Sequence, residues 1–303
     1  MRRIRAYVPS VSSNQISGTI LIIIVAISFA ANSTLGKLSY DYGASPLSVL
    51  TYRTILAAIA VLVIQKISNS SILLPPKIAL VSIFVGVLLA TYSYGLMASI
   101  EHIPVALAVL IFYLYPVFTS LGAWILGQEK MTLKLWVCII VAFFGLSITL
   151  GGGSSLNLIG FCLALTAAVG ITFVLLITNS ILKGQDAKSI SIYTTSSASV
   201  CFLLLDIVVG EFPLPSDNIG VVAFILSGLF YAFSIIGMFI GLSKIGAIKT
   251  SLFMNLEPVS SVFFGMIILD QFLSPIELMG AALVILAVSF ASKDQVELKR
   301  PGQ

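Results

Sequence analysis

Ten apolar runs, separated by short loops, constrain this chain more than any other feature of its sequence. They cover residues 18–38, 46–65, 78–98, 103–126, 133–150, 158–181, 189–209, 219–242, 246–269 and 274–291. Each run is long enough to cross a bilayer as an α-helix, in which every backbone group is hydrogen-bonded within its own segment. A membrane β-barrel would show shorter segments of alternating polarity, which this sequence lacks. The sequence therefore predicts an all-α polytopic membrane protein with about ten transmembrane helices.

Composition excludes the soluble alternatives. Of the 303 residues, 58% are hydrophobic and 9% are charged, against about 45–50% and about 25% in soluble chains. So few charges cannot give a soluble enzyme, a nucleic-acid-binding protein or a disordered chain its solvated surface. The three cysteines lie inside apolar runs, and the lone His102 has no partner at metal-ligand spacing. We expect no cofactor, no metal and no nucleic-acid partner.

The basic residues predict which side of the membrane each loop faces. With a cytoplasmic N-terminus, fourteen of the sixteen lysines and arginines fall on the cytoplasmic side. Lys37 falls outside, and Arg53 lies within the second run. Cytoplasmic loops of membrane proteins usually carry this excess, so both termini are expected in the cytoplasm. A cleavable signal peptide ending near Ser28–Ala30 would leave nine helices and spoil the alternation, so an uncleaved first helix is preferred.

An internal repeat divides the chain into two similar halves. An offset of 142 residues places Gly18 on Gly160 without a gap, and it serves the first, third, fourth and fifth helices of each half. It also aligns Gly86 with Gly228, Gly95 with Gly237, Leu110 with Leu252, Pro116 with Pro258 and Ser147 with Ser289. Because five helices per half is an odd number, the halves must insert in opposite orientations. Inverted repeats are typical of secondary transporters, which bind substrate near the membrane midplane between the halves.

The repeat sets the expected boundaries. We expect a cytoplasmic segment at 1–17, a first repeat at 18–150, a linker at 151–157, a second repeat at 158–292 and a cytoplasmic tail at 293–303.

The chain resembles ten-helix permeases of the drug/metabolite transporter superfamily, which contain two EamA repeats. Motifs in both halves carry the resemblance. In the first half they are Ser45-Pro46 leading to Arg53, Ile103 with Ala106 and Ala108, Leu114-Tyr115-Pro116-Val117 and Leu126-Gly127-Gln128-Glu129. In the second half they are Gly160–Ala168, Ile245–Thr250 and Leu256-Glu257-Pro258-Val259.

The resemblance covers about residues 18–292 and implies an inner-membrane permease that exports amino acids, related metabolites or drugs. Other members take up nucleotides, vitamins or sugar conjugates, so the substrate does not follow from the family. One departure is that the acid at Glu129 is replaced in the second half by Gln271, with Asp270 beside it.

Glu257 is the first candidate for a functional role, because it lies near the middle of the ninth apolar run. An ionisable group at that depth is costly and marks a substrate or proton path. Pro258 follows it and frees a backbone carbonyl one turn earlier, near Met254. The alternative is a neutral carboxyl that hydrogen-bonds to a neighbouring helix.

Arg53 is the other deep charge. A guanidinium group is well suited to hold a substrate carboxylate. The alternative is structural: it pairs with helix-end carbonyls or with a buried acid, of which Glu257 and Asp206 are available.

Two further groups complete the prediction. Pro116 and Pro258 occupy equivalent positions and should kink or open their helices, either as hinges or as fixed kinks. Polar and aromatic groups near the midplane suit a pocket, although each could instead pack between helices or sit at the interface. These pocket candidates are Asn32, Tyr92, Tyr113, Tyr115, Tyr231, Ser234 and Asn255. Gly237 and Gly241 form a GxxxG pattern typical of close helix packing.

The sequence therefore predicts a secondary transporter of the inner or plasma membrane. We expect it to export amino acids or related small metabolites, with proton exchange as the coupling. Its expected partners are a small-molecule substrate and the lipid bilayer; the oligomeric state is left open. We do not expect an enzyme. The alternatives are an importer of a nucleotide, vitamin or other metabolite, an integral-membrane lipid-modifying enzyme, and a membrane scaffold.

Overall fold

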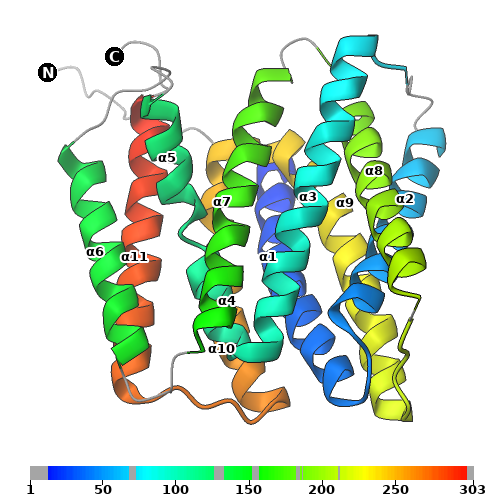
Figure 1. Cartoon of the computed structure of the whole chain (residues 1–303). Coiled ribbons are helices and arrows are strands. Elements are labelled where there is room, and N and C mark those ends of the chain that lie inside the picture. The colour runs from blue at the N-terminus through cyan, green and yellow to red at the C-terminus, as the bar shows by residue number, and fades with distance from the viewer. Residues whose placement is uncertain are drawn as a thin grey trace, which may run out of the picture.

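The structure is a computed structural model that describes residues 13–67, 73–125, 133–151, 157–181, 185, 187–210 and 212–298. Within those ranges it consists of eleven α-helices, without β-strands, arranged as one bundle (Figure 1). They are α1 (Ser13–Asp41), α2 (Pro46–Ile67), α3 (Pro76–His102), α4 (Val105–Phe112), α5 (Tyr115–Ile125), α6 (Leu133–Gly151), α7 (Leu158–Ile181), α8 (Ala187–Val209), α9 (Asn218–Met254), α10 (Leu256–Ile268) and α11 (Pro275–Leu298).

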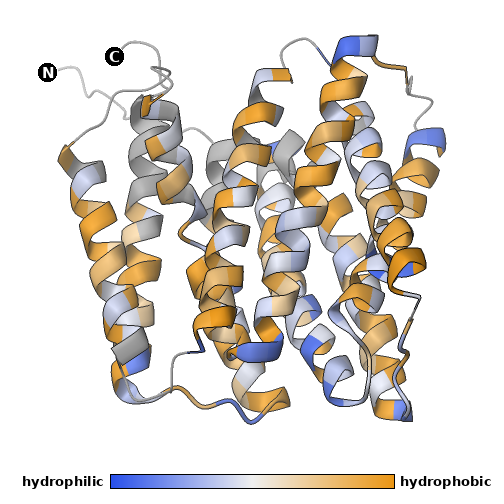
Figure 2. Cartoon of the chain, in the orientation of Figure 1, coloured by the Kyte–Doolittle hydropathy of each residue, from blue (hydrophilic) through white to orange (hydrophobic). Residues whose placement is uncertain are grey.

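The described helices provide the predicted number of apolar segments. Six helices are long and apolar enough to cross a membrane, namely α1, α2, α3, α7, α8 and the first part of α9. Four shorter apolar segments are Val105–Thr119, Trp136–Thr149, Leu256–Ile268 and Pro275–Ala287. Apolar residues run along the sides of the bundle, whereas hydrophilic residues gather at the helix ends (Figure 2). These ten segments match the ten predicted runs, and the bundle presents an apolar belt to lipid.

Two crossings are interrupted, at the prolines where the sequence predicts a kink or an opening. The fourth is divided between α4 and α5, and the ninth between the end of α9 and α10. Each break lies just before a proline, Pro116 or Pro258, because proline cannot donate to the preceding turn and clashes with its carbonyl. Both prolines stand in the first turn of the helix that follows, where a missing N–H costs little.

The expected boundary between the eighth and ninth helices, at residues 243–245, is wrong. α9 continues for 37 residues, from Asn218 to Met254. A straight helix of that length would span about 55 Å, more than the hydrocarbon core of about 30 Å. α9 begins and α10 ends at the same end of the bundle (Figure 1). α9 therefore makes the eighth crossing and also contains the first part of the ninth, with no loop between them.

The two halves are inverted copies. α1 and α7 occupy equivalent positions in the repeat and run in opposite directions (Figure 1). α1 packs against α9, and α7 packs against α3. The 142-residue offset places α1 on α7 and α3 on α9, so the two contacts are equivalent. A Cβ added at Gly18 would lie 2.7 Å from Ile245, and one added at Gly160 would lie 2.8 Å from Ile103. Equivalent residues thus make equivalent close contacts, which only glycine permits.

The GxxxG pattern on α9 packs within the chain, as predicted. The side chains of Val25 and Ile22 on α1 lie where a Cβ at Gly237 or Gly241 would project. The absence of side chains at these two positions lets α1 and α9 approach closely.

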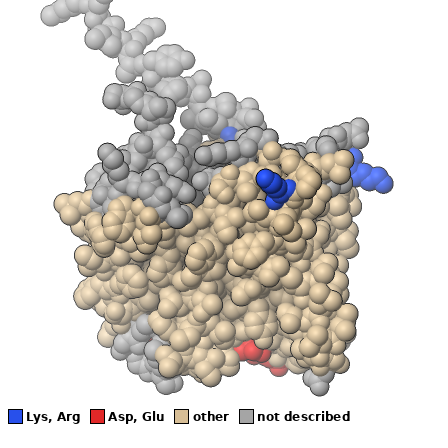
Figure 3. Space-filling model, turned by 45° about the horizontal axis from the view of Figure 1, so that its top comes forward, with Lys and Arg blue, Asp and Glu red and all other residues tan. Residues whose placement is uncertain are grey.

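Charge is divided between the two ends of the bundle. Lys66 ends α2 and Lys77 begins α3, at the end where α1 begins and α11 ends. Asp41 ends α1 and Asp217 precedes α9, at the opposite end. The face in Figure 3 shows the same division of blue and red side chains. The division is consistent with the positive-inside rule, and a cytoplasmic location of both termini stays a prediction.

Several residues behind that prediction lie outside the described part of the chain. They are Arg2, Arg3, Arg5, Lys130, Lys183, Lys299 and Arg300. Most of the 1–17 and 151–157 segments, and the end of the 293–303 segment, also lie outside it.

Candidate functional site

A cavity of about 190 Å³ lies between the two halves of the bundle. We call it the central cavity. Seven of the nine predicted binding or coupling residues line it: Asn32, Arg53, Tyr92, Tyr113, Tyr115, Tyr231 and Glu257. They come from α1, α2, α3, α5, α9 and α10 and from the break after α4. Residues far apart in the sequence, and from both repeats, therefore meet at one place.

Two predicted residues do not line the central cavity. Ser234 is fully buried and donates a hydrogen bond to the Val25 carbonyl at 3.4 Å, which links α9 to α1. Asn255 occupies the break before α10, and its Nδ2 donates to Ser289 Oγ on α11 at 3.3 Å. In this structure both side chains join helices, as small polar residues often do in membranes.

Arg53 reaches the central cavity from α2 and is only 4% exposed. Its guanidinium carbon lies 4.5 Å from the centre of the Tyr231 ring, in cation–π geometry. With the Asn32 amide oriented so that its nitrogen donates to the Ser227 carbonyl at 3.1 Å, its oxygen accepts from Arg53 Nη1 at 3.2 Å. Arg53 Nε has no hydrogen-bond partner among the described residues.

Arg53 also lacks an acidic partner in the part of the chain that the structure describes. The ion pair found there joins Lys37 to Asp41 at 2.7 Å, near the end of α1. A buried cation held only by an amide oxygen and an aromatic ring keeps part of its capacity for an anion. Arg53 therefore keeps hydrogen-bond donor capacity that no described acidic side chain uses.

Glu257 lies in the first turn of α10 and is 7% exposed. Tyr113 Oη lies 2.8 Å from Glu257 Oε2 and 2.8 Å from the carbonyl oxygen of Met254. Pro258 has no N–H to donate to the Met254 carbonyl, which is the free carbonyl that the sequence predicts. This carbonyl accepts a hydrogen bond from Tyr113 Oη instead.

The Tyr113 hydroxyl has a single hydrogen. It can donate to the Met254 carbonyl or to a Glu257 carboxylate, but not fully to both. Both contacts are hydrogen bonds at once only when Glu257 is protonated and donates to Tyr113 Oη. The protonation of Glu257 therefore determines whether Tyr113 can form hydrogen bonds to both the carboxyl and the Met254 carbonyl at the helix break.

Aromatic rings form much of the remaining wall. The Phe112 ring centre lies 6.0 Å from that of Tyr92 and 5.5 Å from that of Tyr115, and Tyr113 and Tyr115 are 5.5 Å apart. Such edge and offset contacts fix the rings against one another. The wall is thus rigid and apolar, with a few polar tips.

The sequence analysis missed several lining residues. They are Phe29, Ser93, Leu96, Phe112, Ile171, Ile235 and Met238. The 142-residue offset relates many lining residues to each other, but it could not have found the missed ones, because it does not show which equivalent positions face the cavity. The pairs are Phe29 with Ile171, Ser93 with Ile235, Leu96 with Met238, Phe112 with Met254 and Tyr115 with Glu257. The two halves therefore contribute equivalent positions to one cavity.

Gln271 acts at a helix end, away from the central cavity. Its Oε1 accepts a hydrogen bond from the Val105 N–H at 3.0 Å and so caps the first turn of α4. Asp270, just before it, adopts a positive φ of 51°. The equivalent Glu129 lies outside the described residues.

No group of three or more His, Cys, Asp and Glu side chains that could hold a metal ion occurs among the residues described. The polar groups that line the central cavity are one guanidinium, one carboxyl, one amide, two serine hydroxyls and several phenols.

Comparison with known proteins places this geometry in a family. The chain matches the EamA-like transporter family twice, over residues 16–151 and 158–293. "Uncharacterized transporter sll1319" of Synechocystis sp. (strain ATCC 27184 / PCC 6803 / Kazusa) is 25% identical over 219 residues, which are 70% of this chain and 66%, just under two thirds, of that protein. "Uncharacterized transporter YyaM" of Bacillus subtilis (strain 168) is 28% identical over 301 residues, 90% of this chain and 93% of that protein.

A solved structure described as "Crystal structure of protein" has the same fold, with a TM-score of 0.60 and 18% identity. The similarity covers 95% of this chain and 99% of that one. Because the two family matches together cover nearly the whole sequence, the chain belongs to the EamA-like transporter family.

Proposed function

We propose that the chain is a secondary transporter of the inner or plasma membrane that exports amino acids or related small metabolites by alternating access. One observation carries the proposal: Arg53 from the first repeat and Glu257 from the second line the same cavity. Each is buried within the bilayer region, where an ionisable group is retained chiefly for function.

The chemistry of the central cavity favours a zwitterion. A guanidinium group binds a carboxylate through paired hydrogen bonds, and a carboxylate in the same cavity attracts an ammonium group. The tyrosine and phenylalanine rings that also line the cavity suit an apolar or aromatic side chain. An α-amino acid combines these three features in one small molecule.

The size of the cavity separates this substrate class from larger ones. About 190 Å³ is below the range of about 300–1,000 Å³ that drug-sized ligands occupy. A nucleotide or a sugar conjugate would need a larger space. The volume therefore favours a small metabolite.

Proton exchange is the proposed driving reaction. A substrate ammonium and a proton compete for the Glu257 carboxyl, so entry of a proton from outside displaces the substrate. The exchange at Glu257 would change the hydrogen bonds of Tyr113, and through them the break in the ninth crossing, since Tyr113 contacts both Glu257 and Met254. Coupling thus needs no group beyond those already in contact.

Alternating access has a structural basis in the two broken crossings. The breaks before Pro116 and Pro258 occupy equivalent positions in inverted repeats, so a movement at one has a counterpart, related by the pseudo-two-fold axis, at the other. Discontinuous helices at the repeat interface are common where transporters bind substrate. We propose that both breaks act as hinges around the central cavity.

Untargeted profiling of the medium tests this function. Cells that overexpress the intact chain are compared with cells that express Glu257→Gln or Arg53→Gln at equal membrane levels. Asp217→Asn is the control, because Asp217 is exposed and makes no side-chain cap at the start of α9. We expect one class of amino acid or related metabolite to accumulate with the intact chain and the control alone.

Two other outcomes contradict the proposal. Faster depletion of a compound added to the medium, with no accumulation outside, means that the chain imports. Equal accumulation with all four chains removes Arg53 and Glu257 from the mechanism.

A further inference from the structure

A buried amide, that of Asn32 on α1, contacts the Arg53 guanidinium group. Asn32 is 3% exposed and lines the central cavity. Its neighbours fix the orientation of the amide, because the Ser227 carbonyl can only accept a hydrogen bond and the Ser33 N–H can only donate one. Nδ2 therefore donates to Ser227 at 3.1 Å, while Oδ1 accepts from Ser33 at 3.3 Å and from Arg53 Nη1 at 3.2 Å. Both ends of the amide are used.

Two contacts restrain the guanidinium group in different directions. Asn32 binds it at an edge, through Nη1. The Tyr231 ring lies against its face, with the guanidinium carbon 4.5 Å from the ring centre. The face contact sets the plane of the group, and the edge contact sets its rotation within that plane. Together they give Arg53 one orientation in the central cavity.

Both contacts depend on α9. Ser227 and Tyr231 lie about one helical turn apart on that helix. The Ser227 carbonyl orients the Asn32 amide, and Tyr231 supplies the ring. A helix of the second repeat therefore sets the orientation of an arginine that belongs to the first.

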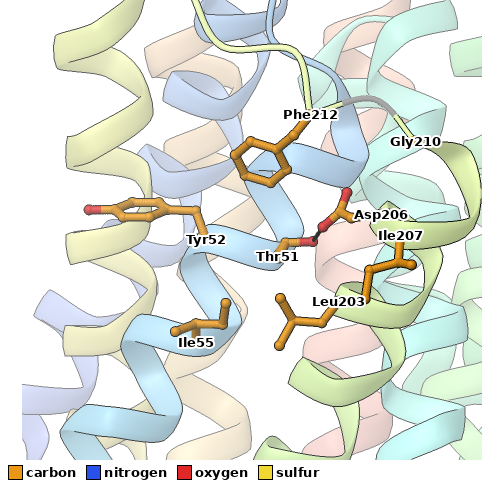
Figure 4. A pocket seen from close by; sticks show the side chains of 8 residues that line it. All are labelled: Thr51, Tyr52, Ile55, Leu203, Asp206, Ile207, Gly210 and Phe212. Atoms are coloured by element: carbon orange, nitrogen blue, oxygen red, sulfur yellow. Dashed lines mark hydrogen bonds between the residues drawn. The ribbon is translucent and has the colours of Figure 1, made fainter.

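The helix that carries Arg53 is also fixed on two sides (Figure 4). The Tyr52 ring stacks on that of Phe224 on α9, with 4.8 Å between the ring centres. Thr51 points toward α8, where its Oγ1 donates a hydrogen bond to Asp206 Oδ2 at 2.5 Å (Figure 4). A rotation of α2 about its axis would break both contacts. The backbone of Arg53 is therefore restrained together with its side chain.

The equivalent helix pair of the other half lacks these supports. The 142-residue offset places Asn32 on Val174 and Leu89 on Tyr231. α7 and α3, which carry Val174 and Leu89, pack against each other as α1 and α9 do. That helix contact forms without an amide or a tyrosine at these positions, so packing alone does not require them. Asn32 and Tyr231 occur at the contact that borders Arg53.

We propose that Asn32 is a positioning residue that, with Tyr231, holds the Arg53 guanidinium group ready for the carboxylate of a substrate. This role rests on the proposed function, in which Arg53 binds that carboxylate. A side chain that is already ordered loses less conformational entropy on binding, and the planar fork of guanidinium then favours a carboxylate over an uncharged group. An amide suits this role because it orders the guanidinium group without neutralising its charge.

Nitrogen-15 NMR of labelled arginine tests the positioning without any substrate. The chain contains five arginines, and the signals of Arg53 are identified by their loss in Arg53→Lys. For the full chain in detergent micelles we expect two separate Nη resonances, because the Asn32 and Tyr231 contacts restrict rotation about the Nε–Cζ bond. Asn32→Leu should merge them, and Asn218→Leu, which changes an exposed asparagine, should not. Merged resonances in the intact chain, or separate ones in Asn32→Leu, would overturn the proposal.

Binding measurements test what the positioning achieves. Equilibrium dialysis with the twenty protein amino acids, read by mass spectrometry, identifies those that the intact chain binds, and the carboxamide of each serves as the comparison without a carboxylate. Asn32→Leu should weaken binding of these amino acids at least tenfold and leave binding of their carboxamides unchanged.

Two other outcomes separate the positioning from the proposed function. Equal weakening of acid and carboxamide would show that Asn32 only joins α1 to α9, and would overturn the proposal. If the intact chain binds none of the twenty while the Arg53 resonances behave as expected, the proposed function fails and the positioning of Arg53 stands.

Asn32→Asp covers a failure of Asn32→Leu to fold. An aspartate has nearly the same size and keeps an acceptor for Arg53, but as a carboxylate it forms an ion pair with the guanidinium group. We expect the Nη resonances to stay separate, and binding of the amino acids to fall at least tenfold because the guanidinium charge is already neutralised. Binding equal to that of the intact chain would overturn the proposal, since Arg53 would then not be the receptor that Asn32 prepares.

Discussion

Replacing Tyr113 with phenylalanine tests whether one hydroxyl joins the two halves at the central cavity. The substitution keeps the ring contacts with Phe112 and Tyr115 and removes only the oxygen. It leaves Glu257 Oε2 and the Met254 carbonyl without the partner that each has at 2.8 Å. Pro258 has no N–H to replace that partner, so the Met254 carbonyl stays unsatisfied.

The size of the effect follows from these two contacts. Interhelical hydrogen bonds in membranes average about 0.6 kcal/mol each, which gives about 1 kcal/mol for the pair when Glu257 is protonated and both contacts are hydrogen bonds. A buried acceptor left without any donor costs about 1–3 kcal/mol, which sets the upper range. We therefore expect Tyr113→Phe to lower the free energy of unfolding by about 1–3 kcal/mol.

Steric trapping in bicelles measures this free energy directly. The control is Tyr94→Phe, because Tyr94 lies on α3 with 43% of its surface exposed. We expect the control to stay within about 0.5 kcal/mol of the intact chain. Equal stability of the intact chain and Tyr113→Phe would refute the reasoning, since the hydroxyl would then hold neither the carboxyl nor the broken helix.

Three further predictions test other parts of the account. Arg53→Lys should reduce transport of carboxylate substrates in proteoliposomes at least tenfold, because an ammonium group cannot reproduce the planar fork of guanidinium. Unchanged transport would show that Arg53 does not bind the substrate carboxylate. Gly18→Val and Gly160→Val should each lower the free energy of unfolding by about 1–3 kcal/mol, since equivalent side chains block both; a loss at one position alone would contradict the symmetric packing. Gln271→Leu should speed hydrogen exchange of the Val105 amide, whose acceptor it removes, without affecting the substrate affinity of the central cavity; slow exchange at Val105 would show that another group caps α4.

Much of the fold could be predicted from the sequence because lipid imposes simple rules. A segment that crosses hydrocarbon must satisfy its own backbone, so apolar length identifies the helices. An odd number of helices per repeat then dictates inversion. The breaks before Pro116 and Pro258 were also predictable, because proline removes a donor and crowds the preceding carbonyl. These features depend on local chemistry, which a single sequence contains.

The rest depends on contacts between distant segments. Nothing local distinguishes Ser234, which packs against α1, from Tyr231, which reaches the central cavity three residues earlier on the same helix. The continuous course of α9 past residue 245 was not predictable from local sequence either, because the equivalent positions of the first repeat end one helix at His102 and begin the next at Val105. The sequence indicated Asp206 only as a buried acid, because its contact with Thr51 forms only where α2 and α8 meet.

Efflux from proteoliposomes tests the central claim most directly. Vesicles that contain the purified chain are loaded with the twenty protein amino acids and diluted into acidic buffer, and mass spectrometry follows which compounds leave. The account predicts that at least one amino acid leaves faster from vesicles with the intact chain. Glu257→Gln should abolish the dependence on the pH gradient, and Arg53→Gln should abolish the efflux. If every amino acid leaves the intact vesicles no faster than it leaves vesicles with both substitutions, the central cavity is not a site for zwitterion transport.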